Sequence, residues 1–98
     1  MSNLYDLCWD DTFKMSVEEE QGKLFIHCDV VKFSKETLSK IKECWSMAKT
    51  SLSEQGFDSI YSYTDNLQFC EVVDNSFTKL TSLDVDGKTL EVLKWELK

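Results

Sequence analysis

The chain has 98 residues, 42% of them hydrophobic and 12% aromatic, so it is long enough for one domain with a real core and too apolar for a disordered segment. Its net charge is −7, and all 11 of its cationic residues are Lys. Because Arg is the side chain that clamps phosphates and reads guanine edges, the composition argues against nucleic-acid binding. An acidic surface favours a protein partner with a basic surface, although an AT-rich genome would also account for the all-Lys composition.

Four cysteines and one histidine are spread along the chain without the spacing of a zinc site. Cys28 and Cys44 fall on apolar faces, where we expect the buried free thiols of a protein in a reducing cytosol. A secreted disulfide framework is not expected, because residues 1–11 carry acids instead of the cationic start of a signal peptide. No apolar run is long enough to span a bilayer. We therefore expect a cytoplasmic protein with no membrane anchor and no metal.

Residues 12–31 are predicted to form a hairpin. Two stretches in which apolar and polar side chains alternate are separated by an acidic, glycine-containing turn at residues 18–22. Period two in both stretches is typical of antiparallel strands. The preceding segment, residues 1–11, has three apolar side chains at helical spacing: Leu4, Leu7 and Trp9.

A long helix over residues 34–55 is the best-defined element. Ser34 offers an N-cap oxygen, and Gly56 suits the C-terminal end of the helix. Apolar side chains recur at spacings of three and four and define the face expected to pack on a sheet: Leu38, Ile41, Trp45, Ala48 and Leu52.

Residues 58–97 are predicted to form a strand, a helix and a closing hairpin. A stretch rich in Ile and Tyr predicts the strand, and a helix over residues 66–73 follows, with Thr64 or Asp65 as its cap. Asp86-Gly87 between two extended runs is a strong hairpin signal. Since a strand–helix–strand connection needs a crossover, the order β-β-α-β-α-β-β predicts an α+β fold with a mixed or antiparallel sheet.

This order resembles the acetyl-CoA-dependent N-acetyltransferase (GNAT) fold from its third strand to its end, over residues 12–97. The residues that carry the resemblance are Gly56-Phe57, Ile60-Tyr61-Ser62-Tyr63, Asn66, Phe77 and Leu93-Lys94-Trp95-Glu96-Leu97. The chain looks closest to the short, degenerate GNAT-like proteins of bacteriophages. It lacks the family's first strand and the two helices after it, so the resemblance implies a single half-GNAT-like domain over residues 1–98.

The resemblance also implies where acetyl-CoA would bind. In active members a glycine-rich loop before the long helix cradles the pyrophosphate, whereas residues 31–35 contain no Gly here. Phe69 stands where active members often carry a tyrosine that acts as the general acid. We therefore expect no catalytic residue and no cofactor. The side chains that would meet acetyl-CoA, if it binds, are Lys32, Ser34, Lys35 and Asn66, although the two lysines could simply be solvated.

Other candidate groups have a structural explanation as well as a functional one. His27 lies on the polar side of its strand with no Cys or Ser motif beside it, which favours a surface ring over a catalyst. Cys70 could be a nucleophile, but neighbouring carboxylates disfavour its thiolate. The aromatic side chains of Tyr61, Tyr63 and Trp45 could stack a ligand, but their spacing favours packing between helix and sheet.

Two functions remain open. The first, which we favour, is a non-catalytic, acidic protein-binding module, encoded by a phage, that inhibits or modulates a host protein complex as counter-defence proteins do. The second is a minimal N-acetyltransferase whose cleft is completed by another chain. We also expect a homodimer formed by the N-terminal hairpin or an uncovered sheet face. The candidate partner-binding residues are Asp10, Asp11, Glu18, Glu19 and Glu20, the last three of which could equally form a solvated turn.

Overall fold

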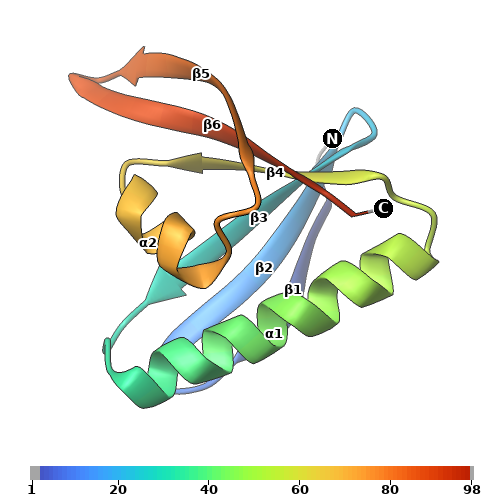
Figure 1. Ribbon diagram of the computed structural model, residues 1–98, viewed down its shortest axis with the longest axis vertical. Helices are drawn as coiled ribbons and strands as arrows, with labels where there is room; N and C mark the ends of the chain where they lie inside the picture. The colour runs from blue at the N-terminus through green and yellow to red at the C-terminus, as the bar shows by residue number, and fades with distance from the viewer. Residues whose placement is uncertain (1–2, 98) are drawn as a thin grey trace.

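The computed structural model describes residues 3–97, which form one six-stranded sheet and two helices (Figure 1). The strands lie side by side in the order β1-β2-β3-β4-β6-β5, and every neighbouring pair is antiparallel except β3 and β4. The predicted α+β class and mixed sheet are confirmed. The elements are β1 (Asn3–Trp9), β2 (Phe13–Glu20), β3 (Lys23–Val30), α1 (Lys35–Glu54), β4 (Ser59–Thr64), α2 (Leu67–Val73), β5 (Thr78–Val85) and β6 (Lys88–Glu96).

Two tight turns close the hairpins that the sequence predicts. Gln21 and Gly22 join β2 to β3 with φ angles of 54° and 79°, and Asp86 and Gly87 join β5 to β6 with 51° and 80°. Positive φ at both central residues matches the right-handed twist of the flanking strands, and a glycine at the second position adopts it without steric cost.

Helix α1 lies across one face of the sheet. It buries Ile41, Trp45, Ala48 and Leu52 as predicted, while Leu38 is half-buried; Thr37 and Cys44 complete the buried stripe. The partners of this stripe are the inward side chains of the strands, Phe13, Met15, Val17, Leu24, Ile26, Ile60, Leu93 and Trp95. The sheet face that carries these side chains is called the helix face below.

Helix α2 is held against α1 and β6 by Asp74, its C-cap. The indole N–H of Trp45 donates to the Asp74 carboxylate at 2.7 Å. The indole N–H of Trp95 donates to the backbone carbonyl oxygen of Asp74 at 3.1 Å. Lys49 Nζ lies 2.6 Å from the same carboxylate. Burial by itself would raise the pKa of Asp74, but hydrogen bonds from Lys49, Ser76 and Trp45 outweigh it and hold that pKa well below its usual range. One charged residue thus joins three elements.

The N-terminal segment forms a strand that the sequence did not predict. Residues 3–9 form β1, an edge strand beside β2, and not a helix, because pairing with β2 outweighs a short run of helical spacing. A register shift between Asp6 and Cys8 marks an irregularity that brings Cys8 to the helix face.

A disulfide joins Cys8 to Cys44 of α1, which corrects the expectation of a free thiol at Cys44. The pairing depends on the placement of β1, which the sequence did not predict. Cys28 is a free, half-buried thiol as expected. Among residues 3–97, no helix is long and apolar enough to cross a membrane.

The cap of α2 is a further correction. Asn66, not Thr64 or Asp65, is the N-cap: its Oδ1 accepts from the Phe69 N–H at 3.1 Å. Thr64 Oγ1 accepts from the Asn66 N–H just before the helix. Asn is as good a capping residue as Asp, so the choice is set by where β4 ends.

Candidate functional site

The parallel strands β3 and β4 diverge and leave a cleft between them. They are paired at one register position, Phe25 with Tyr61, and Figure 1 shows them separating toward the ends from which each connects to a helix. A crevice at the carboxyl ends of parallel strands is the usual place for a ligand in such sheets. Here it is a cavity of about 240 Å³.

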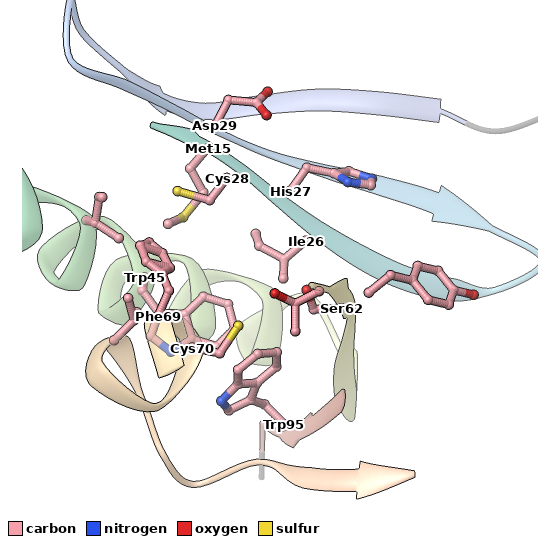
Figure 2. Close-up of a pocket in the computed structure, with 14 residues that line it drawn as sticks. Met15, Ile26, His27, Cys28, Asp29, Trp45, Ser62, Phe69, Cys70 and Trp95 are labelled. Carbon is pink, nitrogen blue, oxygen red and sulfur yellow. The ribbon is translucent and has the colours of Figure 1, made fainter. Parts of the chain in front are cut away.

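The cavity is apolar and aromatic on its helix side. Figure 2 shows Phe69 and Cys70 of α2 near Trp45 of α1 and Trp95 of β6, with Cys28 on the β3 wall. The Trp45 and Trp95 rings meet edge to face with centroids 5.0 Å apart. Phe69, which has no hydroxyl, faces this cavity at the position that the family resemblance assigns to a general acid.

The two free thiols in the cavity are poor nucleophiles. Burial, with Asp29 and Cys70 adding to it, raises the pKa of Cys28 to about 11. Burial also raises the pKa of Cys70, and the charge of Glu71 adds to this effect, while a hydrogen bond with Thr64 opposes it. Since the thiolate is the reactive form, both groups are protonated near neutral pH and the inert interpretation of Cys70 is supported.

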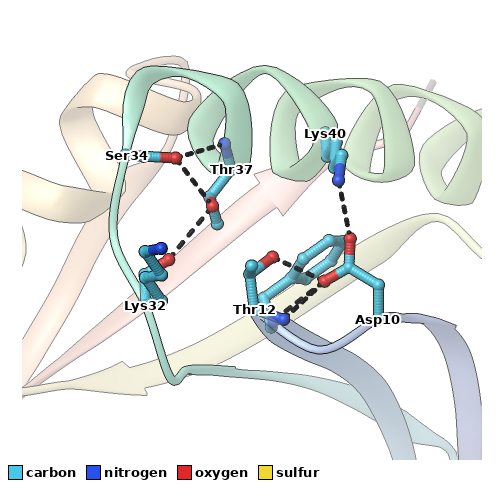
Figure 3. Close-up of polar contacts among 7 residues, drawn as sticks. Asp10, Thr12, Lys32, Ser34, Thr37 and Lys40 are labelled. Atoms are coloured by element: carbon cyan, nitrogen blue, oxygen red, sulfur yellow. Dashed lines mark hydrogen bonds and ion pairs between the residues drawn. The ribbon is translucent and has the colours of Figure 1, made fainter.

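The N-terminus of α1 is closed by its own residues (Figure 3). Ser34 Oγ accepts from the Thr37 N–H at 3.1 Å, and the Thr37 hydroxyl donates to the Lys32 carbonyl oxygen at 3.0 Å. Lys32 and Lys35 are exposed beside this turn. At least one of the helix-end amides that could meet a phosphate is therefore already occupied by a side chain.

The two helix starts lie close together. Phe33, before α1, meets Phe69 of α2 edge to face with ring centroids 6.3 Å apart. A groove of about 660 Å³ runs between them and includes Val31 and Asn66. The structure thus brings Asn66 near the turn that contains Lys32, Ser34 and Lys35. The side-chain amide oxygen of Asn66, however, is committed to capping α2.

The acidic candidates form two separate groups. Asp10 and Asp11 lie in the turn from β1 to β2, where Asp10 accepts from Thr12 and pairs with Lys40 at 2.9 Å (Figure 3). The bond from the Thr12 hydroxyl is the main reason that the pKa of Asp10 is low. The second group, Glu18–Glu20, is at the other end of β2, and Glu18 lies 3.2 Å from His27 Nε2. These residues are therefore not one patch.

A partly exposed aromatic cluster lies on the face of the sheet opposite the helices, called the open face below. The Phe25 and Tyr63 rings stack with centroids 5.1 Å apart, and Tyr61 lies 5.8 Å from Phe25. Lys23 and Lys94 lie over the Tyr61 ring at 5.6 and 6.0 Å. Both helices pack on the other face, so no described helix covers this cluster (Figure 1).

The sequence predicted that Tyr61 and Tyr63 pack between a helix and the sheet. This prediction is wrong. Their neighbours Ile60 and Ser62 are the buried residues of β4, and alternation in a strand then places the two tyrosines on the opposite face. The same alternation in β3 places Phe25 there, between Leu24 and Ile26. Strict use of the two-residue period would have found this cluster in the sequence.

Comparison with solved structures shows that the fold is GNAT-like. An aminoglycoside 6'-acetyltransferase type Ii matches 94% of this chain and 67% of its own with a TM-score of 0.75 at 14% identity. A "putative acetyltransferase from Agrobacterium tumefaciens" matches 97% of this chain and 75% of its own with a TM-score of 0.61 at 19% identity. No family model and no curated protein matches the sequence. At these identities the likeness shows the fold and not the activity.

The described residues contain no cluster of side chains that could bind a metal ion. Within residues 3–97, no three His, Cys, Asp or Glu side chains converge in a way that could hold an ion. His27 lies on the open face, as expected, with its Nε2 atom 3.2 Å from the Glu18 carboxylate.

Proposed function

We propose that this chain is a non-catalytic protein-binding module that uses a GNAT-like fold as its scaffold and the open face as its binding surface. The aromatic cluster on this face carries the proposal. Tyr63 is 47% exposed while it stacks on Phe25, so a flat aromatic surface is offered to solvent. Tyr is enriched at the centres of protein interfaces because a rigid ring supplies a large contact area together with a hydroxyl.

The chemistry of the cleft also favours binding over catalysis. Phe69 cannot donate a proton, and the raised pKa values of Cys28 and Cys70 leave no thiolate nucleophile at neutral pH. The turn before α1 carries bulky, exposed Val31 and Phe33 where a pyrophosphate would need close backbone approach.

The partner proposed is a protein with a basic surface, and the setting is a phage-encoded inhibitor of a host complex. The net charge of −7 supports the first part, since an acidic protein associates fastest with a basic one. The phage setting rests on the resemblance to short GNAT-like phage proteins. The acids that would steer a basic partner toward the open face are two that this face carries, Asp6 and Glu18, with Glu20 at the end of β2.

Two measurements test this function. Acetyl-CoA at saturating concentration is expected to leave the melting temperature unchanged in the wild type. Stabilisation by several degrees that Lys32→Glu abolishes would contradict the proposal. In parallel, material captured from host lysate by the wild type is compared with that captured by Tyr63→Ser and Tyr5→Ser. Tyr5, 54% exposed and opposite Val17 on the helix face, is the matched control. Only the Tyr63 substitution should reduce capture of a specific protein.

A second candidate function is a minimal acyl-CoA-dependent N-acetyltransferase completed by another chain. The cavity of about 240 Å³ between β3 and β4, at the carboxyl ends of parallel strands, favours it. If acetyl-CoA binds in this cleft, it should raise the melting temperature of the protein. Phe69→Ala should change that increase, and Tyr63→Ser should not. The same titration thus separates the two functions.

A further inference from the structure

Strand β5 is an uncovered edge of the sheet. It pairs with β6 on one side and is last in the strand order, and all eight of its residues are exposed. Three of these are large and apolar: Leu80, Leu83 and Val85 are 49%, 42% and 45% exposed. A strand edge of this kind presents a row of backbone donors and acceptors to any strand that can pair with it.

The β5–β6 hairpin also receives little support from the rest of the molecule. Strand β6 pairs with β4 over Glu91–Glu96, so residues 88–90 pair with β5 alone. Figure 1 shows the turn of this hairpin extending away from the helices. A two-stranded hairpin is marginally stable in water, and a third strand along β5 would stabilise it.

The sequence of β5 is complementary to itself when it is paired antiparallel about a twofold axis at Ser82. Leu80 and Thr81 together occupy one position opposite Val92, where the register with β6 shifts. When that irregularity is counted as one position, Lys79 falls opposite Asp84 of a second copy, and Leu80 and Thr81 fall opposite Leu83. Each contact occurs twice by symmetry.

The faces of the strand agree with this register. Lys79 and Asp84 pair with Leu93 and Thr89, two residues that alternation places on one face of β6. Thr81 and Leu83 pair with Val92 and Leu90 on the other face. Residues directly opposite in an antiparallel pair must share a face, and both sets do. The irregularity at Leu80 would disturb pairing with a fully regular strand. In the proposed register, however, Leu80 lies opposite the apolar side chain of Leu83 from the second copy.

In a single copy, Lys79 and Asp84 can each still form an ion pair with a second copy. Lys79 Nζ lies 2.9 Å from Glu91 but is about half exposed, so it can bridge to a second carboxylate. Asp84 Oδ1 accepts from the Thr89 hydroxyl at 3.0 Å, which leaves its other oxygen for Lys79 of the second copy.

We propose that β5 is an interaction surface for a second copy of this chain, and that two copies join their sheets through antiparallel β5 strands with Lys79 of each facing Asp84 of the other. This interface is separate from the open-face cluster and does not depend on the proposed function. The proposed contact is an alternative to the N-terminal hairpin and the uncovered sheet face, which the sequence had suggested for a homodimer.

Charge reversal tests the register directly. Sedimentation velocity from about 1 to about 200 μM is expected to show a monomer–dimer equilibrium for the wild type. Lys79→Glu places two pairs of like charges in the interface, as does Asp84→Lys, so each single variant is expected to dimerise at least about tenfold more weakly. The double variant should recover dimerisation.

A mixture of the two single variants gives a sharper test. A heterodimer of Lys79→Glu with Asp84→Lys has opposite charges at both contacts, so mixing two weakly dimerising proteins should restore the dimer. Lys88→Glu changes the net charge of the same hairpin away from the β5 edge and serves as the control. Circular dichroism melts check that each variant folds.

Three results would overturn the proposal. These are a wild type that is monomeric at every concentration, a dimer that both single reversals leave unchanged, and a mixture that stays monomeric although both variants are folded.

Discussion

Replacement of Trp45 tests how α1 is fixed to the sheet and to α2. The ring is 5% exposed, stacks edge to face on Trp95, and donates its indole N–H to Asp74 at 2.7 Å. Removing a buried Trp ring costs about 3–5 kcal/mol, of which the lost hydrogen bond to a charged group accounts for about 1.5–3 kcal/mol. A domain of this size has a total stability of about 5–15 kcal/mol, so Trp45→Ala removes a large share of it.

Trp45→Phe separates the two contributions, because it retains most of the ring contact and loses the N–H. We expect about 1.5–3 kcal/mol for Trp45→Phe and about 3–5 kcal/mol for Trp45→Ala, measured as free energies of unfolding in urea. Met47 on the same helix is 63% exposed and gives the control, with less than about 0.5 kcal/mol expected for Met47→Ala. A cost below about 1 kcal/mol for Trp45→Ala, equal to that of the control, would refute this placement of the helix.

Three further outcomes follow from single contacts. The carboxylate of Asp74 has a lowered pKa, so its stabilisation is present above the unfolded-state pKa of about 3.9 and is lost as the pH falls toward the folded-state value. The stability gap between wild type and Asp74→Asn in urea should therefore shrink from pH 7 to pH 3. Reduction of the Cys8–Cys44 disulfide, which closes a loop with a sequence separation of 36, should cost up to about 4 kcal/mol, and the melting temperature of Cys8→Ser should not respond to reductant. Ser34→Ala removes the N-cap of α1 and should cost about 1 kcal/mol in the same urea assay, while an unchanged midpoint would show that Ser34 Oγ does not cap the helix.

Local patterns were sufficient where an element depends mainly on its own residues. The apolar stripe of α1 and the cap at Ser34 are properties of one helix, and they predicted both its extent and its buried face. Asp86-Gly87 predicted its turn because positive φ at consecutive residues is a requirement of short hairpins themselves. The order of elements from residue 12 onward and the GNAT-like fold followed from these signals.

The candidate site was predicted only in part. Sequence reasoning named the start of α1, Asn66 and Cys70 as candidates, but it missed the aromatic cluster of Phe25, Tyr61 and Tyr63 because it assigned these tyrosines to the helix side. It also could not show that the acidic candidates form two groups, which an eight-residue strand separates. Distances between residues of different elements are not encoded in local spacing.

The sequence by itself determined which segments from residue 12 onward become strands and helices, and which side of α1 is buried, since these depend on periodicity and capping within one element. Only the tertiary structure decided that residues 3–9 form an edge strand, that Cys8 reaches Cys44, and that Asp74 joins both helices to β6. It also decided that β3 and β4 diverge into a cleft and that the opposite face stays open. The physical reason is that strand pairing and packing depend on many contacts between residues far apart in the sequence. A weak local preference, such as the helical spacing of Leu4, Leu7 and Trp9, is overridden when a neighbouring strand offers hydrogen bonds along a whole edge.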